Sequence, residues 1–304
     1  MTDYNIDFLI AGLVFLIFLL IHFQRYKKLN NISGRTFWFL IIAGIFDIIF
    51  DLLSSILLVK SNPAYNSWMI FFSTMLYILQ IIVVYIFYNY TQALRHCDED
   101  IRTRNIKIMA VPILCMEVAI VTNVLHKQFF YCNEQGQYVH GKAYLVTYIF
   151  TLICIAAVII NCFINQEEYQ KNELRAIKEF LGVALVCVTI QMKFQSVLMT
   201  GFGLSLGITI LFWALYNPQL YIDSLTGLYS KGYFRRWFPE QIKRKKELHL
   251  LMIDLWKLKQ VNKLYGVTTG DELLIQIAEY LHKINEANHV FRIHGNRFLC
   301  SQHH

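Results

Sequence analysis

Residues 249–271 read HLLMIDLWKLKQVNKLYGVTTGD, and this stretch decides the fold of the carboxyl-terminal part of the chain. It opens with an apolar run that ends in Asp254, which predicts a buried strand. Residues 269–272, TGDE, have the form of a capping box and predict the start of a helix. Leucine and isoleucine residues from Leu273 to Ile284 recur at helical spacing and predict its buried face. A strand followed by a helix indicates an α/β fold, in which ligands bind beside the carboxyl ends of the central strands.

Further motifs flank this stretch on both sides. Upstream, residues 223–228 read DSLTGL, and downstream, residues 294–298 read HGNRF. Lys259 and Asn262 stand between them, together with the Gly-Asp pair that ends the stretch quoted above. The spacing of the whole set resembles the GGDEF domain of bacterial diguanylate cyclases, over about residues 218–300. The resemblance implies a nucleotidyl-cyclase-like fold that binds GTP and condenses two copies into cyclic di-GMP.

The resemblance also implies roles for single residues. Asp254 matches an aspartate that binds magnesium, and Lys259 matches a lysine that contacts the nucleotide phosphates. Asn262 and Asp271 match the two residues that read the guanine edge. GTP is therefore the implied ligand and Mg²⁺ the implied cofactor.

The signature turn departs from the family pattern. Gly295 and Phe298 fit, but His294 replaces a glycine, and Asn296 and Arg297 replace two acids. Magnesium requires oxygen ligands that converge from two chain segments, and it must neutralise charge as the hydroxyl attacks. A positive side chain at one of these positions opposes the metal. We therefore expect no intact catalytic set, and only weak binding of Mg²⁺.

Composition separates the rest of the chain from this domain. Hydrophobic residues make up 56% of the chain and charged residues 16%, which excludes an ordinary soluble protein. The apolar runs before residue 217 are long enough to cross a bilayer. We predict seven transmembrane helices, at residues 8–22, 37–59, 68–88, 108–125, 144–164, 180–198 and 202–216. The amino terminus lacks the basic start and cleavage site of a signal peptide, so the first helix is expected to be retained.

Positive charge orients the predicted bundle. With the amino terminus outside, the cytoplasmic loops carry eleven Lys and Arg residues and the outer loops four. The positive-inside rule thus places the carboxyl terminus in the cytoplasm, where GTP is found. The expected location is the cell membrane of a bacterium, crossed several times.

Carboxylates inside the predicted spans are candidates for sensing. Asp47 and Asp51 lie four residues apart, on one face of the second span, and Glu117 lies in the fourth. Such residues are costly in a membrane and usually face a cavity or a partner. The first interpretation is a site for an unknown small-molecule signal, an ion or a proton. The alternative is an interhelical hydrogen bond to Gln80, Asn161 or Gln191.

Gly203 and Gly207 form a small-xxx-small pair in the last predicted span. This spacing lets two helices approach closely. The partner is either a helix of the same bundle, which we favour, or a second copy of the chain.

The expected architecture is an α-helical polytopic membrane bundle at residues 1–217, followed by a partial α/β GGDEF domain at residues 218–304. The chain stops six residues after Phe298, so the domain is expected to be truncated. The leading hypothesis is an inactive, membrane-bound signalling protein that binds GTP or regulates cyclic di-GMP signalling, as a homodimer or beside an intact GGDEF protein. The alternatives are an active diguanylate cyclase and a seven-helix sensor or transporter with a vestigial tail. No motif indicates a nucleic-acid partner.

Overall fold

The computed structural model describes residues 6–24, 32–60, 63–133, 135, 137–194, 197–216, 222–243, 247–284 and 289–303. The chain divides into two compact units, Met1–Ala214 and Leu215–His304. The domain boundary predicted at residues 217 and 218 lies outside the described residues. Each unit has its own architecture.

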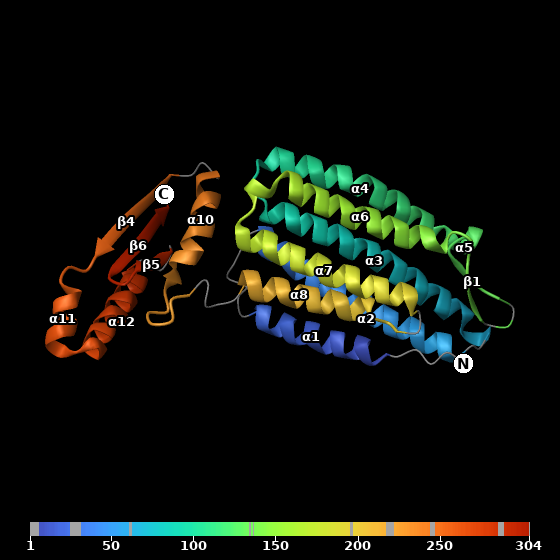
Figure 1. Cartoon of the computed structure of the whole chain (residues 1–304), viewed down its shortest axis with the longest axis horizontal. Helices are drawn as coiled ribbons and strands as arrows, with labels where there is room; N and C mark the ends of the chain where they lie inside the picture. The colour runs from blue at the N-terminus through green and yellow to red at the C-terminus, as the bar shows by residue number, and fades with distance from the viewer. Residues whose placement is uncertain are drawn as a thin grey trace. The chain divides into compact units, whose positions relative to one another are not determined.

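The first unit is helical (Figure 1). Its long helices are α1 (Asp7–Gln24), α2 (Ile32–Lys60), α3 (Asn66–Leu94), α4 (Glu99–Val121), α6 (Tyr144–Ile164), α7 (Lys171–Lys193) and α8 (Thr200–Tyr216). Short 3₁₀ turns at Pro63–Tyr65 and Gln166–Glu168 and a short helix, α5 (Asn123–His126), lie between them. Strands β1 (Phe130–Cys132) and β2 (Tyr138–His140) form an antiparallel hairpin.

A helix lies at each of the seven predicted spans, but only four of the described helices are long and apolar enough to cross a membrane. These four lie at Asp7–Gln24, Ile32–Leu58, Pro63–Leu94 and Tyr144–Ile164. Helix α8 is apolar but shorter. Helices α4 and α7 begin with charged turns, which lowers their mean hydropathy. The structure therefore supports a membrane protein with four candidate spans, and it does not confirm seven.

Two predicted spans overran the helices. The span predicted at 108–125 extends beyond α4, which ends at Val121. Just after this end, the Asn123 side chain donates to the Phe130 carbonyl (2.8 Å) and accepts from the Phe129 amide (2.8 Å). These bonds turn the chain toward the β1–β2 hairpin. The span at 180–198 passes the end of α7 at Lys193. Near that end the Gln191 side chain accepts hydrogen bonds from the backbone amides of Met199 (2.9 Å) and Thr200 (2.8 Å), where α8 begins.

The glycine pair packs inside the bundle. A Cβ at Gly203 would lie 2.6 Å from the Cβ of Cys187, and one at Gly207 would lie 2.5 Å from the Phe180 ring. Both neighbours belong to α7, which runs beside α8 in Figure 1. The favoured prediction, close packing within the bundle, is confirmed.

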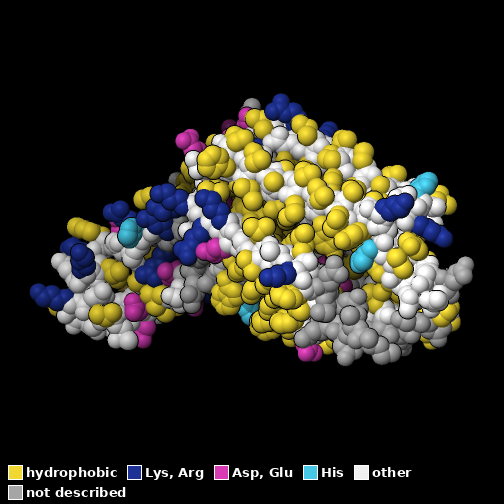
Figure 2. Space-filling model, turned by 45° about the vertical axis from the view of Figure 1, so that its right-hand side comes forward, with side chains coloured by type: hydrophobic (Ala, Val, Ile, Leu, Met, Phe, Trp, Pro, Cys, Tyr) yellow, Lys and Arg dark blue, Asp and Glu magenta, His cyan; other side chains and the backbone are white. Residues whose placement is uncertain are grey.

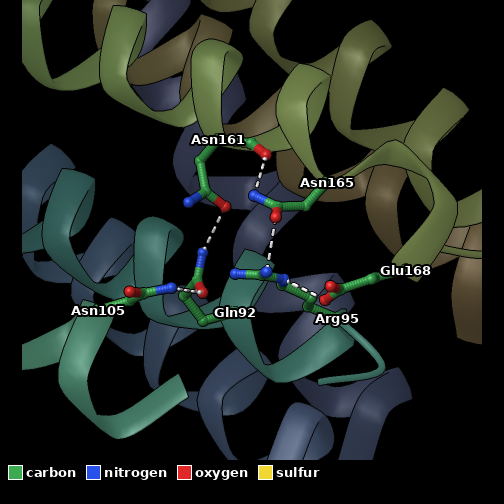
Figure 3. A network of polar contacts seen from close by, with 6 residues as sticks. All are labelled: Gln92, Arg95, Asn105, Asn161, Asn165 and Glu168. Carbon is green, nitrogen blue, oxygen red and sulfur yellow. Dashed lines mark hydrogen bonds and ion pairs between the residues drawn. The ribbon is translucent and has the colours of Figure 1, made fainter. Parts of the chain in front are cut away.

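A polar network ties α3 to the segment that joins α6 and α7 (Figure 3). Arg95 at the end of α3 donates to Glu168 (2.5 Å) and to Asn165 (2.6 Å). Gln92 donates to Asn161 (2.8 Å), one turn back on α6. The Arg95 side chain is only 6% exposed, so its charge is balanced inside the protein by Glu168. Asn161 is thus engaged by Gln92, and this hydrogen bond gives it a partner other than the α2 aspartates.

The outer surface of the helices is strongly apolar, and Figure 2 shows a broad hydrophobic face. Large exposed side chains line α4 and α6, among them Leu114, Val118, Ile153 and Phe163. A contiguous apolar surface of this kind is costly in water. It fits contact with lipid.

The second unit is an α/β domain. Its elements are β3 (Tyr229–Ser230), α10 (Lys231–Lys243), β4 (Leu248–Asp254), α11 (Leu258–Tyr265), α12 (Val267–Ile284), β5 (Val290–His294) and β6 (Arg297–His303). The strand order is β3-β5-β6-β4, with β3 parallel to β5 and the other pairs antiparallel. Leu228, Leu274, Ala278, Val290 and Phe298 form the buried core between the sheet and α12.

Three local predictions for this unit were wrong. The strand that ends at Asp254 was predicted to be buried and central, but β4 lies at the edge of the described sheet, with Leu251 64% and Met252 61% exposed. Helix α12 begins at Val267, so residues 269–272 lie inside the helix and do not cap it. Ile284, predicted on the buried face, is 64% exposed at the last turn.

Candidate functional site

The signature turn is a tight hairpin beside the end of β4. Strands β5 and β6 pair through His294 and Arg297, which leaves Gly295 and Asn296 as the two turn residues. On the other side of β6, Arg297 stands opposite Asp254 in the antiparallel register. The pairing brings together the aspartate and the turn, as their expected shared site requires.

Two side chains of the turn segment hold the Asp254 carboxylate. Asn296 Nδ2 donates to Oδ1 (2.5 Å), and Arg297 Nε donates to Oδ2 (2.8 Å). Asn296 is itself fixed by two hydrogen bonds to Leu255. Its side-chain amide donates to the Leu255 carbonyl (3.0 Å), and its backbone carbonyl accepts from the Leu255 amide (3.0 Å). Both oxygens of the carboxylate therefore accept from the chain's own donors, one of which is cationic.

These residues do not fit a magnesium ion. Magnesium takes oxygen ligands in near-octahedral geometry and favours carboxylates. Here a carboxylate, an amide and a guanidinium converge, and the guanidinium supplies the positive charge that a metal would bring. The expectation of weak magnesium binding is therefore consistent with the geometry of Asp254, Asn296 and Arg297.

The two residues expected to read guanine lie on neighbouring helices. Asn262 is half-buried on α11, and its Oδ1 has no hydrogen-bond partner among the described residues. This oxygen lies against Gly270, where a Cβ would come within 1.8 Å of it, so a larger residue at this position would displace the Asn262 side chain. Asp271 follows Gly270 on α12 and is half-buried. The close approach at Gly270 thus places Asn262 next to Asp271.

Lys259 is exposed on α11, one turn before Asn262. The described contacts join Asp254 to the turn and Asn262 to Gly270, and Lys259 takes part in neither. His294 is exposed at the end of β5, and Phe298 is fully buried in the core.

Sequence reasoning missed Arg292. Its guanidinium donates to Asp223 Oδ1 (2.8 Å) and to the Gly295 carbonyl (2.8 Å), so it joins the upstream motif to the signature turn. Burial raises the pKa of Asp223, but hydrogen bonds from Arg292 and Thr226 outweigh it and hold the pKa below the usual 3.8. The available signal was one arginine in the otherwise apolar strand at residues 290–293.

The membrane candidates divide into two groups. Asp47 and Asp51 on α2 are 5% and 6% exposed, and each lines a cavity inside the helical unit. Glu117 is half-buried on α4 and lines neither of these cavities. The structure thus brings the first two together and leaves the third apart.

Comparison with known proteins concerns the second unit. Residues 220–301 match the family model described as diguanylate cyclase, GGDEF domain. Diguanylate cyclase DosC of Escherichia coli (strain K12) is 28% identical over 94 residues, which cover 29% of this chain and 20% of that protein. The uncharacterized protein YtrP of Bacillus subtilis (strain 168) is 37% identical over 59 residues, which cover 19% of this chain and 10% of that protein.

One solved structure shows the same relationship in sequence. It is the X-ray structure of a diguanylate cyclase/phosphodiesterase from Caldicellulosiruptor saccharolyticus, 29% identical, covering 28% of this chain and 53% of that chain with a TM-score of 0.27. The chain spans about a fifth of the length of the curated diguanylate cyclases that it matches.

Proposed function

Because residues 220–301 belong to the GGDEF domain family, we propose that this chain is a membrane-bound signalling protein whose GGDEF domain does not synthesise cyclic di-GMP. The helical unit crosses the cell membrane, with the amino terminus outside and the GGDEF domain in the cytoplasm. The apolar helices and the distribution of positive loop residues support this topology.

One observation carries the proposal for the domain. The Asp254 carboxylate is held by Asn296 and Arg297, at 2.5 Å and 2.8 Å. A guanidinium cannot act as a metal ligand, and it does not lower the pKa of an attacking hydroxyl as a bound metal ion does. The chain therefore lacks, at this position, the chemistry that phosphoryl transfer needs.

The residues that match the nucleotide contacts of the family are present. We propose that it binds GTP weakly, through Asn262 and Asp271 to the guanine and Lys259 to the phosphates. The packing of Asn262 against Gly270, which places it next to Asp271, supports this role, because a ligand is recognised by a few polar side chains held in fixed positions. A GGDEF domain that binds GTP without turnover regulates signalling by pairing with an intact cyclase or with its own copy.

The test is a pair of assays on the full chain in lipid nanodiscs. Cyclic di-GMP formation is followed with GTP and magnesium, and GTP binding is followed with a labelled nucleotide. We expect no turnover, and binding that Asn262→Ala abolishes while Lys263→Ala, an exposed change one residue on, leaves it intact. Turnover by the unmodified chain would overturn the proposed inactivity. Binding that ignores Asn262 would overturn the proposed guanine site.

A further inference from the structure

The helical unit contains two neighbouring cavities with opposite character. The first, about 130 Å³, is walled mostly by apolar side chains of α3, α6, α7 and α8, with Asp47 as its carboxylate. The second, about 170 Å³, is lined by Asp51, several hydroxyl groups and His140 of the β1–β2 hairpin. Tyr77, Gln80, Tyr148 and Gln191 line both cavities. The two cavities are therefore adjacent, and a ligand in one lies close to the side chains of the other.

Asp47 is the unsatisfied group of the first cavity. It is 5% exposed, and among the described residues its Oδ1 has no hydrogen-bond partner. An unpaired carboxylate in an apolar cavity is unfavourable, and a bound cation compensates it directly. The orphaned oxygen therefore indicates a ligand that carries a donor and a positive charge.

The charges around the two cavities have one sign. Among the described residues that line them are two carboxylates and neither lysine nor arginine. Burial lowers the pKa of His140, so its ring is uncharged at neutral pH. The described residues that line the two cavities therefore supply no counter-charge.

The second cavity offers oxygen atoms and aromatic faces to a cation. Tyr77 and Tyr138 share a hydrogen bond (3.3 Å), as do Ser54 and Ser73 (3.2 Å). Four tyrosines line this cavity, and tyrosine faces attract ammonium groups. In the described part of the chain no group of three or more His, Cys, Asp or Glu side chains could hold a metal ion. The donors fit an organic cation better than a metal.

We propose that this site binds an organic ammonium ion, an amine with an apolar group of about the size of a benzene ring. The ammonium group meets Asp47 and Asp51, and the apolar group fills the first cavity, whose volume is close to the ~150 Å³ of a cavity known to hold benzene. The proposal deepens the membrane-bound signalling role proposed above and rests on it for the consequence of binding. Binding itself does not depend on the GGDEF domain.

The test uses the full chain in nanodiscs, 2-phenylethylamine as the probe and 2-phenylethanol as its neutral counterpart. Thermal unfolding is followed by tryptophan fluorescence at rising probe concentration, since a ligand that binds the native state raises Tm. We expect the amine to raise Tm and the alcohol not to. Asp47→Asn should weaken amine binding about 30-fold or more, because it removes one partner of a buried ion pair.

Glu117→Gln is the matched control. It neutralises another acid with an unpartnered oxygen in the helical unit, outside both cavities, and should bind the amine as the unmodified chain does. Asp47→Asn removes a buried acid that has an unpartnered oxygen, so its own Tm should be unchanged or higher, which separates lost binding from lost folding. Equal shifts with amine and alcohol would overturn the proposal, as would no shift at millimolar amine, or a shift that sodium chloride alone reproduces. Tm reports binding without reference to turnover, so this proposal and the proposed inactivity fail separately.

Discussion

Restoring the two acids of the signature turn should make the GGDEF domain depend on magnesium. In the double variant Asn296→Asp/Arg297→Glu, both donors to Asp254 are replaced by carboxylates. Three carboxylates then converge at a place where one carboxylate is now paired with a guanidinium and accepts a hydrogen bond from an amide. Without a metal the hairpin should loosen, and with magnesium it should recover.

The magnitude follows from exposure. Arg297 and Asp254 are 2.8 Å apart, with side chains 54% and 47% exposed. An exposed pair contributes about 0–1 kcal/mol, and like charges at ~4 Å in water repel by about 1 kcal/mol, so reversal costs about 1–2 kcal/mol. Magnesium at about ten times its Kd returns roughly 1.4 kcal/mol.

The assay is hydrogen–deuterium exchange by mass spectrometry on the full chain, read from peptides within residues 289–303. A change of 1–2 kcal/mol makes exchange about 5- to 30-fold faster in the variant without magnesium. The unmodified chain should exchange at one rate with and without magnesium. Arg175→Glu, which reverses a comparable exposed ion pair in α7, is the control and should leave this hairpin unchanged. Magnesium protection of the unmodified hairpin, or none in the double variant, would refute the reasoning.

Three further predictions follow from single contacts. Gly207→Ala should destabilise the helical unit by about 1–3 kcal/mol, measured by thermal unfolding, because the added Cβ would lie 2.5 Å from the Phe180 ring; an unchanged Tm would contradict the packing. The pKa of Asp223 lies below the usual 3.8, so its stabilising effect is complete above that value and is lost as pH falls through the lower folded value. Hairpin exchange corrected for intrinsic rates should therefore quicken at acid pH, and Asp223→Asn should remove that part of the dependence; a variant with an unaltered pH profile would argue against it. Gly270→Ala should abolish GTP binding by displacing Asn262, whose Oδ1 would lie 1.8 Å from the new Cβ, and retained binding would contradict the close approach.

Sequence alone predicted one strand, one helix and the signature turn of the GGDEF domain, and it predicted the exposure of the strand and the start of the helix poorly. The spacing from the apolar run to the signature turn predicted the strand before Asp254, the helix after it and a turn at residues 294–298, which the structure shows as the turn between β5 and β6. Apolar residues in a short run do not distinguish a central strand from an edge strand, so the exposure of Leu251 and Met252 could not be predicted. The start of α12 at Val267 was missed because the residues of a capping box can also occur within a helix, where they do not mark its first turn.

The contact that defines the site was also beyond the sequence. Losing two acids predicted a weaker metal site, and Arg297 was read as a charge that opposes a metal. Its actual place, bonded to Asp254, depends on the antiparallel register of β4 and β6, which sets the two residues opposite each other. In the helical unit, the spacing of Asp47 and Asp51 predicted a shared face, but the two cavities depend on side chains from five other elements.

The contact between Phe180 and Gly207 has a mechanical consequence. Phe180 lines the Asp47 cavity and stacks on Phe87, with ring centroids 4.1 Å apart. Its other neighbour is the bare backbone of Gly207, where no space is left for a side chain. Because the Phe180 ring is packed directly against the α8 backbone, a displacement of the ring toward α8 must move that helix as well. Helix α8 extends to Tyr216, so a displacement at the cavity acts on the helix that ends the described part of the helical unit.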